Sequence, residues 1–153
     1  MKLLGKSLNG QDPHVAGLAL LQTLYGGPLP EIQRTPRGKP FFVDSPLHFS
    51  ISHTKHHVFC ALSERPIGID AEELERHVNP ALAQKILSPT ELAQFQQAQD
   101  PQRALLTFWV LKEAAAKCSG EGLQGYPNHT AFCLDDPRVQ EIYGCLVAVV
   151  ENI

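Results

Sequence analysis

The sequence predicts an α+β fold built from two similar halves. Short runs with period-two alternation, at 48–52 and 58–63, predict strands. Each half has a helix-rich stretch followed by a predicted β-hairpin, so we expect an N-terminal half at 1–75 and a C-terminal half at 76–153, packed as one compact unit. Helix starts with an N-cap residue before proline recur at Asp12-Pro13, Asn79-Pro80, Ser88-Pro89 and Asp100-Pro101.

The first half begins with a helix and continues with short strands. The helix begins after Asp12, and Gly26-Gly27 ends it. In the last strand of this half, Ile67 and Ile69 share one face, while Gly68 and Asp70 share the other. The expected strands lie at 48–52, 58–63 and 67–71, with a turn at 36–38 and a hairpin loop at 54–57.

The second half is mainly helical. Ser88 and Glu91 have the spacing of a capping box, in which the serine and the glutamate each bind a backbone N–H at the helix start. The longest helix runs from Asp100 to about Cys118 and ends before Gly120. Segments 131–134 and 143–150 are predicted to close the fold as a strand pair.

Composition narrows the class of protein. The 153 residues are 43% hydrophobic, which is typical of a folded domain, and the net charge of −3 disfavours nucleic-acid binding. No apolar run approaches the length of a membrane span, and the N-terminus lacks the apolar core of a secretory signal. We therefore expect a cytoplasmic protein without nucleic-acid or membrane partners, and a monomer.

The cysteines predict neither disulfides nor zinc. None forms a C-x-x-C pair, and each has apolar neighbours, so we expect four buried, reduced side chains. They are Cys60, Cys118, Cys133 and Cys145.

Two carboxylates on one strand suggest a metal site. Asp70 and Glu72 are two residues apart, so both lie on the same face of the predicted strand. A divalent cation relieves the repulsion between such neighbours, and oxygen ligands favour Mg²⁺. The alternative is a solvated, acidic strand end.

The longest helix carries two stripes of side chains. Trp109, Glu113 and Lys117 recur every four residues and form a polar stripe beside the core. The alternative for Glu113 and Lys117 is an ordinary surface ion pair. The apolar stripe, which should face the core, consists of Phe108, Leu111, Ala115 and Cys118.

Basic residues gather near the predicted turn at 36–38. Arg34, Arg37 and Lys39 lie around Gly38, and Ser52-His53 ends a predicted strand. Together they have the donors to bind a phosphate group. The alternative is a solvated turn with an ordinary loop histidine.

Five segments, taken in order, resemble the 4′-phosphopantetheinyl transferase superfamily, specifically its surfactin-synthetase-activating type. The patterns of that type include G-K-P, F-N-x-S-H-S, G-I-D-x-E and W-x-x-K-E-x-x-x-K-x-x-G-x-G-L. Three small differences occur, since Ser50 replaces asparagine, Thr54 replaces serine and Ala71 replaces isoleucine or valine. The chain is shorter than is typical for that type. The matching segments are Gly38–Pro40, Phe49–Thr54, Pro66–Glu72, Leu87–Leu92 and Trp109–Leu123.

The resemblance implies a pseudo-dimer of two α+β halves with the active site between them. It implies transfer of the 4′-phosphopantetheine group from coenzyme A to a serine of an apo carrier protein, with Mg²⁺ as cofactor and 3′,5′-ADP as the leaving group. Fatty-acid, polyketide and nonribosomal-peptide carriers all remain open.

The resemblance also implies roles for individual residues. Asp70, Glu72 and Glu113 would bind the metal, and Glu113 would also accept the serine proton. Lys112 and Lys117 would contact the pyrophosphate and the leaving group. Lys39, Ser52 and His53 would contact the 3′-phosphate region of coenzyme A, with Arg34 nearby.

Two alternative functions remain open at this point. One is a regulatory relative that binds coenzyme A without turnover. The other is a Mg²⁺-dependent nucleotide pyrophosphohydrolase, since paired acids with lysines suit that chemistry as well. Only the transferase needs a carrier protein, so carrier labelling distinguishes it from both.

Overall fold

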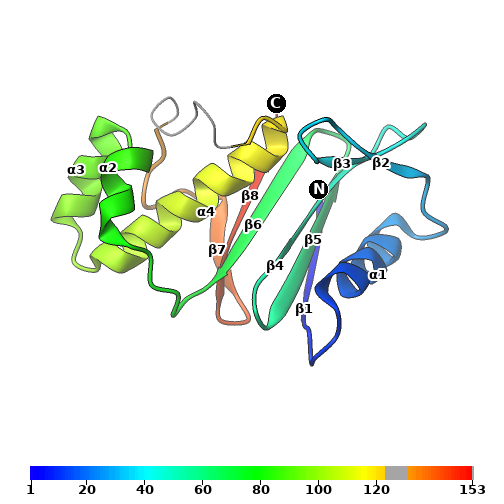
Figure 1. The fold of residues 1–153 in the computed structure, drawn as a ribbon, viewed down its shortest axis with the longest axis horizontal. Coiled ribbons are helices and arrows are strands. Elements are labelled where there is room, and N and C mark those ends of the chain that lie inside the picture. The colour runs from blue at the N-terminus through cyan, green and yellow to red at the C-terminus, as the bar shows by residue number, and fades with distance from the viewer. Residues whose placement is uncertain (123–130, 153) are drawn as a thin grey trace.

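The computed structural model describes residues 1–122 and 131–152 and has the predicted α+β architecture. Two three-stranded antiparallel sheets meet in the middle, with one long helix packed on each (Figure 1). The helices are α1 (Pro13–Tyr25), the 3₁₀ turn η1 (Pro80–Leu82), α2 (Ala83–Ile86), α3 (Pro89–Gln97) and α4 (Pro101–Ser119). The strands are β1 (Lys2–Ser7), β2 (Ile32–Arg34), β3 (Pro40–Phe42), β4 (His48–His53), β5 (His57–Ser63), β6 (Ile67–Glu73), β7 (Val139–Ile142) and β8 (Cys145–Glu151).

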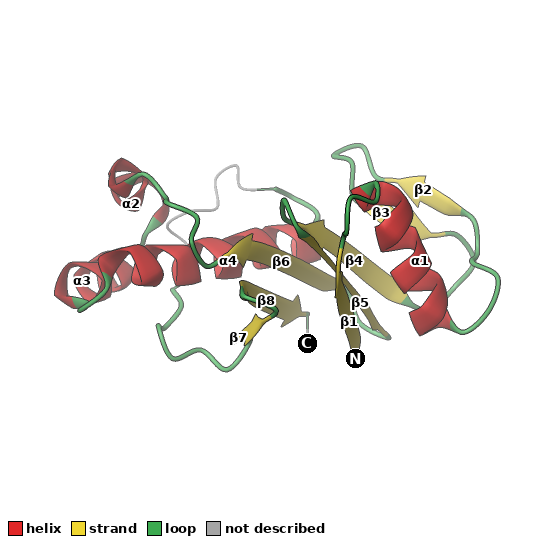
Figure 2. Ribbon diagram, turned by 90° about the horizontal axis from the view of Figure 1, so that it is seen from below, coloured by secondary structure: helices red, strands yellow, loops and turns green. Residues whose placement is uncertain are grey.

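The two large sheets have the same strand order. The first is ordered β1-β5-β4 and the second β6-β8-β7, so in each sheet the first strand pairs with the last strand of the hairpin. Along the chain, a helix follows that first strand and precedes the hairpin in both cases, α1 in the first and α4 in the second. Each of these helices packs against its own sheet (Figure 2). β2 and β3 form a separate two-stranded ribbon.

The predicted helix caps are confirmed. The Asp12 carboxylate accepts a hydrogen bond from the His14 backbone N–H at 3.0 Å, and α1 ends at Gly26 with φ of 86°. Ser88 and Glu91 form the reciprocal capping box at the start of α3. Each cap binds backbone groups that the first or last turn of a helix leaves without partners.

The predicted closing strand pair is wrong in its first member. Residues 131–134 are not a strand, and β7 lies further along the chain. The backbone N–H of Phe132 donates to the Glu91 carboxylate at 2.7 Å, so this segment is bound to α3 rather than to a strand. Tyr143 and Gly144, with φ of 53° and 73°, make the tight turn between β7 and β8. Strands β1, β2 and β3 were not predicted from the sequence pattern.

Serine side chains connect the two large sheets. β4 and β6 run side by side, and the hydroxyl groups of Ser50 and Ser52 accept the backbone N–H groups of Ile69 and Ala71, each at 3.1 Å. These bonds satisfy buried N–H groups that would otherwise carry a desolvation cost. The side chains of Ile67, Ile69 and Ala71 share one face of β6 and join a core that both sheets contribute to.

Strand β6 therefore has two different faces, as predicted. The odd-numbered residues face the shared core, and the even-numbered residues face α4. At Gly68 the helix backbone lies directly on the strand, because an added Cβ would be 1.9 Å from the Ala114 carbonyl oxygen. This close approach brings the side chains of α4 onto those of Asp70 and Glu72.

Three of the four cysteines are buried, as expected, but Cys133 is exposed. Cys133 follows Phe132, whose side chain is buried, and so faces away from the core. Over residues 1–122 and 131–152, no helix has the length and apolar character needed to cross a bilayer.

Candidate active site

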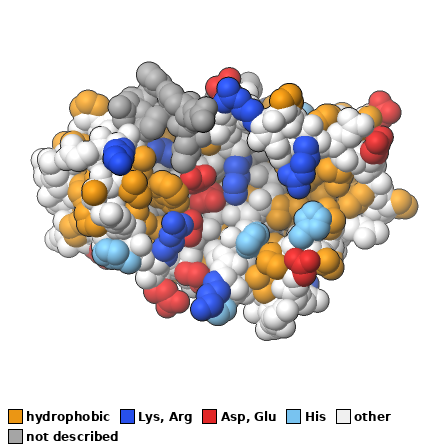
Figure 3. Space-filling model, in the orientation of Figure 1, with side chains coloured by type: hydrophobic (Ala, Val, Ile, Leu, Met, Phe, Trp, Pro, Cys, Tyr) orange, Lys and Arg blue, Asp and Glu red, His pale blue; other side chains and the backbone are white. Residues whose placement is uncertain are grey.

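A cavity of about 400 Å³ lies where the two halves meet. Its size falls in the ordinary range for small-molecule sites. One wall is the C-terminal part of α4, and the opposite wall comes from α1, β4 and the turn between β2 and β3. Figure 3 shows acidic side chains in the middle of one face, with Lys and Arg side chains on either side. The charged residues that line the cavity are Arg34, Arg37, Lys39, Glu113 and Lys117.

The three predicted metal ligands come from β6 and α4, as the sequence indicated. Asp70 and Glu72 lie on the face of β6 that α4 covers, and Glu113 lies on the polar stripe of α4. Glu72 accepts hydrogen bonds from the Trp109 indole N–H at 3.3 Å and from the Arg76 guanidinium. The three carboxylates are close enough that Glu72 and Glu113 both act to raise the pKa of Asp70.

Asp70 is the most constrained of the three. Its side chain is 7% exposed, and its Oδ1 atom lies 3.3 Å from Lys117 Nζ. Its other oxygen, Oδ2, is buried and has no hydrogen-bond partner in the described part of the chain. Burial raises the pKa of Asp70 to about 7, and the adjacent Lys117 opposes that effect. A buried carboxylate oxygen without a partner, beside two more carboxylates, fits a divalent cation.

The structure does not gather the three carboxylates as tightly as a loaded metal site. Among the described residues, the group of three potential ligands whose atoms all lie within 4.8 Å of one another is a different one, His57, Glu73 and Cys145. The carboxylates of Asp70, Glu72 and Glu113 lie near one another, but their oxygen atoms are not all within 4.8 Å of one another.

Lys117 connects the helix to the acidic strand. Its ammonium group donates to the backbone carbonyl of Ile69 at 3.0 Å and to Asp70 Oδ1 at 3.3 Å. Burial raises the pKa of Glu113, Glu72 adds to the rise, and Lys117 opposes it. Glu113 and Lys117, one helical turn apart, both line the cavity.

The basic turn closes the cavity over the end of α4. Lys39 Nζ donates to the backbone carbonyl of Cys118 at 2.7 Å, and the Arg37 guanidinium donates to the Glu121 carbonyl. Burial lowers the pKa of Lys39. Arg34 donates to the Gly38 carbonyl at 2.8 Å. Three cations therefore meet at this rim, as the sequence indicated.

Ser52 and His53 do not line the cavity. The Ser52 hydroxyl is buried, where it accepts from the Ala71 N–H and lies 3.5 Å from Asp70 Oδ1. His53 is exposed at the end of β4, with its Nδ1 atom 3.4 Å from the Thr54 carbonyl oxygen. Ser52 thus supports the acidic strand, and the neighbouring Ser50 lines the cavity instead.

Lys112 is not brought to the cavity either. Its side chain is 1% exposed, and Nζ lies 2.8 Å from Oε1 of Glu91, which is fully buried. Successive helical residues are about 100° apart, so Lys112 faces the core while Glu113 faces the cavity. The same Glu91 carboxylate receives the Ser88 and Phe132 N–H groups, at 2.8 and 2.7 Å. Lys112 and Glu91 together hold α3, α4 and residue 132 in place.

Several residues of the cavity carried no sequence signal. His14 and Leu18 of α1 and Ile32 of β2 line it, because tertiary packing brings these elements next to α4. Arg76, which binds Glu72, lies in a loop after β6. Trp109 belongs to the predicted polar stripe, but nothing in the spacing indicated its hydrogen bond to Glu72.

Comparison with known protein families shows which family this chain belongs to. Residues 66–147, more than half of the chain, match the model of the 4′-phosphopantetheinyl transferase superfamily. The chain belongs to this superfamily. The match spans β6 and α4, the two elements that carry the three carboxylates and Lys117.

Curated transferases of this superfamily are similar to the chain over part of their length. The 4′-phosphopantetheinyl transferase gsp of Aneurinibacillus migulanus is 34% identical over 69% of this chain and 44% of that protein. HetI of Nostoc is 32% identical over 71% of this chain and 52% of that protein. Sfp of Bacillus subtilis is 37% identical over 56% of this chain and 39% of that protein. The chain spans about half the length of the curated relatives it matches.

Proposed function

We propose that this protein transfers the 4′-phosphopantetheine group of coenzyme A to a serine of an apo carrier protein. The observation that carries the proposal is the cavity between the halves, where Glu113 and Lys117 face Lys39 and Arg34. Such a cavity has cations for the phosphates of coenzyme A, and Glu113 in its wall lies near Asp70 and Glu72, so that the three carboxylates offer oxygen ligands for a Mg²⁺ ion. The relatives named as 4′-phosphopantetheinyl transferases support this reaction class.

In this proposal Asp70, Glu72 and Glu113 hold the metal. A bound Mg²⁺ would supply charge neutralisation for the pyrophosphate of coenzyme A. The carrier serine oxygen attacks the phosphorus that bears pantetheine, the bond from that phosphorus to the leaving phosphate breaks, and 3′,5′-ADP departs. Glu113, which lines the cavity, accepts the serine proton.

The cations of the cavity interact with the phosphate groups of coenzyme A in this proposal. Lys117 lies beside Asp70 at the cavity wall and stabilises the charge that develops on the departing phosphate. Lys39 and Arg34, at the rim, bind the 3′-phosphate of coenzyme A. The family resemblance also implicates Lys112, Ser52 and His53. In this scheme these side chains do not contact coenzyme A, and they act only by positioning neighbouring residues.

We also propose that the chain is a pseudo-dimer of two similar halves. The shared strand order, β1-β5-β4 and β6-β8-β7, supports this, as does the helix between the first strand and the hairpin in each. The pairing of β6 with β8 favours a division between β5 and β6 over the division after residue 75 expected from the sequence. We further propose that the protein is a cytoplasmic monomer.

Carrier labelling tests the proposal. The protein is incubated with coenzyme A, Mg²⁺ and a panel of apo carrier proteins, and mass spectrometry follows the mass of each carrier. We expect a carrier to gain the phosphopantetheine mass, and Asp70→Asn and Glu113→Gln to abolish the gain. Glu75→Gln, at an exposed acid near the end of β6, is the matched control and should retain activity.

Two other results would replace the proposal. Release of free phosphopantetheine without any labelled carrier would indicate a pyrophosphohydrolase. Tight coenzyme A binding with neither product would indicate a binding protein.

A further inference from the structure

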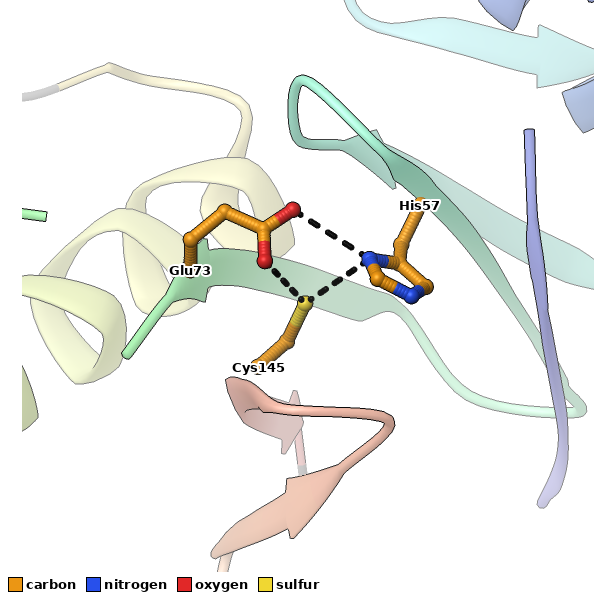
Figure 4. A group of neighbouring side chains, drawn as sticks. All are labelled: His57, Glu73 and Cys145. Carbon is orange, nitrogen blue, oxygen red and sulfur yellow. Dashed lines mark hydrogen bonds and ion pairs between the residues drawn. The ribbon is translucent and has the colours of Figure 1, made fainter. Parts of the chain in front are cut away.

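A second cluster of metal-binding side chains lies on the other face of β6. His57 at the start of β5, Glu73 at the end of β6 and Cys145 at the start of β8 come together there (Figure 4). His57 Nδ1 lies 3.2 Å from Glu73 Oε1 and 3.5 Å from Cys145 Sγ, and Sγ lies 3.5 Å from Glu73 Oε2. The three side chains thus converge on one point from three strands.

Two of these separations match those between the ligand atoms of a tetrahedral zinc site. Zinc binds imidazole nitrogen and carboxylate oxygen at about 2.0–2.2 Å and thiolate sulfur at about 2.3 Å, which puts tetrahedral ligand atoms about 3.3–3.6 Å apart. The Nδ1–Oε1 and Nδ1–Sγ separations of 3.2 and 3.5 Å are close to that range, and Sγ contacts the other carboxylate oxygen, Oε2, at 3.5 Å. The cluster offers nitrogen, sulfur and oxygen, a set that suits zinc better than Mg²⁺.

Neighbouring residues hold two of the three ligands in position. The Thr54 hydroxyl donates to Glu73 Oε1, which fixes one end of the carboxylate. The Tyr143 ring stacks on the His57 imidazole, with ring centres 6.1 Å apart and planes 7° apart. Contacts of this kind orient metal ligands in known sites. Cys145 follows directly on the Tyr143-Gly144 turn, so the conformation of that turn sets the position of the sulfur.

The cluster can be reached from the surface through two of its three side chains. Cys145 is fully buried, and its thiol contacts both His57 and Glu73. The His57 and Glu73 side chains remain 18% and 17% exposed, so an ion can reach them.

We propose that His57, Glu73 and Cys145 form a zinc site with three protein ligands and a fourth position for water. The site is separate from the carboxylates that face α4, because Glu73 points to the opposite side of β6 from Glu72. A bound ion would join β5 of the first sheet to β6 and β8 of the second. This proposal does not depend on the transferase proposal.

Zinc and cobalt binding to the full chain test the proposal. Zinc affinity is measured by competition with a chromophoric chelator for the wild type, His57→Gln and Cys145→Ser. His56→Gln and Cys133→Ser are the matched controls, since both side chains are exposed. We expect one zinc per chain, a loss of at least about tenfold in affinity for each ligand variant, and no change in the controls.

Cobalt reports on the sulfur directly. Co²⁺ should give the ultraviolet charge-transfer band of a thiolate ligand in the wild type and in Cys133→Ser, and no such band in Cys145→Ser. If Cys145→Ser does not fold, the zinc affinity of His57→Gln tests the site instead, because the His57 side chain lies at the surface of the cluster. Equal zinc affinity in all variants, or no thiolate band in the wild type, would overturn the site.

Discussion

The contact between α4 and β6 at Gly68 gives the sharpest test of how this site is assembled. A Cβ added at Gly68 would lie 1.9 Å from the Ala114 carbonyl oxygen and 2.4 Å from the Cys118 backbone nitrogen. Both atoms belong to the helix backbone, so no side-chain rotation can relieve the overlap. Gly68→Ala must therefore push α4 away from the strand.

The size of the effect follows from that geometry. The overlap with the carbonyl oxygen is deep, so the helix has to shift by roughly an ångström before the new methyl group fits. Overpacking of a buried contact typically costs about 1–3 kcal/mol, and a rigid backbone neighbour favours the upper end. For a chain of this size, about 3 kcal/mol lowers the melting temperature by about 6–12 °C. The same shift moves Glu113 and Lys117 away from Asp70, so carrier labelling should fall even where the protein remains folded.

Thermal unfolding and carrier labelling measure both effects. Gly27→Ala is the matched control, since nothing lies within 4 Å of its added Cβ and its φ is not in the positive region. It should leave the melting temperature unchanged or raise it slightly. If Gly68→Ala melts within about 2 °C of the wild type, the helix does not rest on the strand backbone as described.

Three further predictions concern charged side chains. In chelator, Asp70→Asn should raise the melting temperature. Burial lifts the pKa of Asp70 to about 7, so ionising this carboxyl lowers the stability of the folded protein increasingly from about pH 4 upward, and fully above about pH 7. Glu91→Gln should cost about 3–5 kcal/mol in the free energy of unfolding, since it breaks the buried pair with Lys112, and adding Lys112→Met should recover part of the loss. Lys39→Ala should weaken coenzyme A binding about tenfold more than 3′-dephospho-coenzyme A binding, whereas exposed Lys55→Ala should not.

Each of these has a clear contrary result. An Asp70→Asn effect that is equal at about pH 4 and about pH 8 would mean that the carboxylate is not a buried charge. Full stability of Glu91→Gln would mean that its pair with Lys112 contributes little to the fold. Equal losses for both forms of coenzyme A in Lys39→Ala would remove Lys39 from the 3′-phosphate site.

The local features of the fold could be predicted because they depend on neighbouring residues. Proline after an N-cap residue located α1, α3 and α4, and alternation located β6 with Asp70 and Glu72 on one face. Strand β1 was missed because what fixes it is its pairing with β5, more than fifty residues further along the chain. Segment 131–134 was misassigned for a similar reason, since its anchor is the carboxylate of Glu91.

The direction of Lys112 could have been predicted, whereas its partner could not. Lys112 lies four residues after Phe108 and three before Ala115, both on the core stripe of α4, so helical periodicity already places it inward. A lysine in such a position needs a buried acid. Nothing in the spacing identifies Glu91 as that acid, because α3 and α4 meet only in the folded chain.

Strand β6 explains how one chain can offer two different metal environments, one on each face of the same strand. Side chains alternate along a strand, so Asp70 and Glu72 face α4 while Glu73 faces His57 and Cys145. The first face presents oxygen ligands only, and the second adds nitrogen and sulfur, so the two faces favour different ions. Because Thr54 fixes Glu73 while Trp109 and Arg76 fix Glu72, loss of one set of ligands leaves the supports of the other intact. Cys145→Ser should therefore retain carrier labelling in Mg²⁺, and Asp70→Asn should retain the thiolate band with Co²⁺. A loss of both signals in either variant would mean that the two faces form a single coupled site.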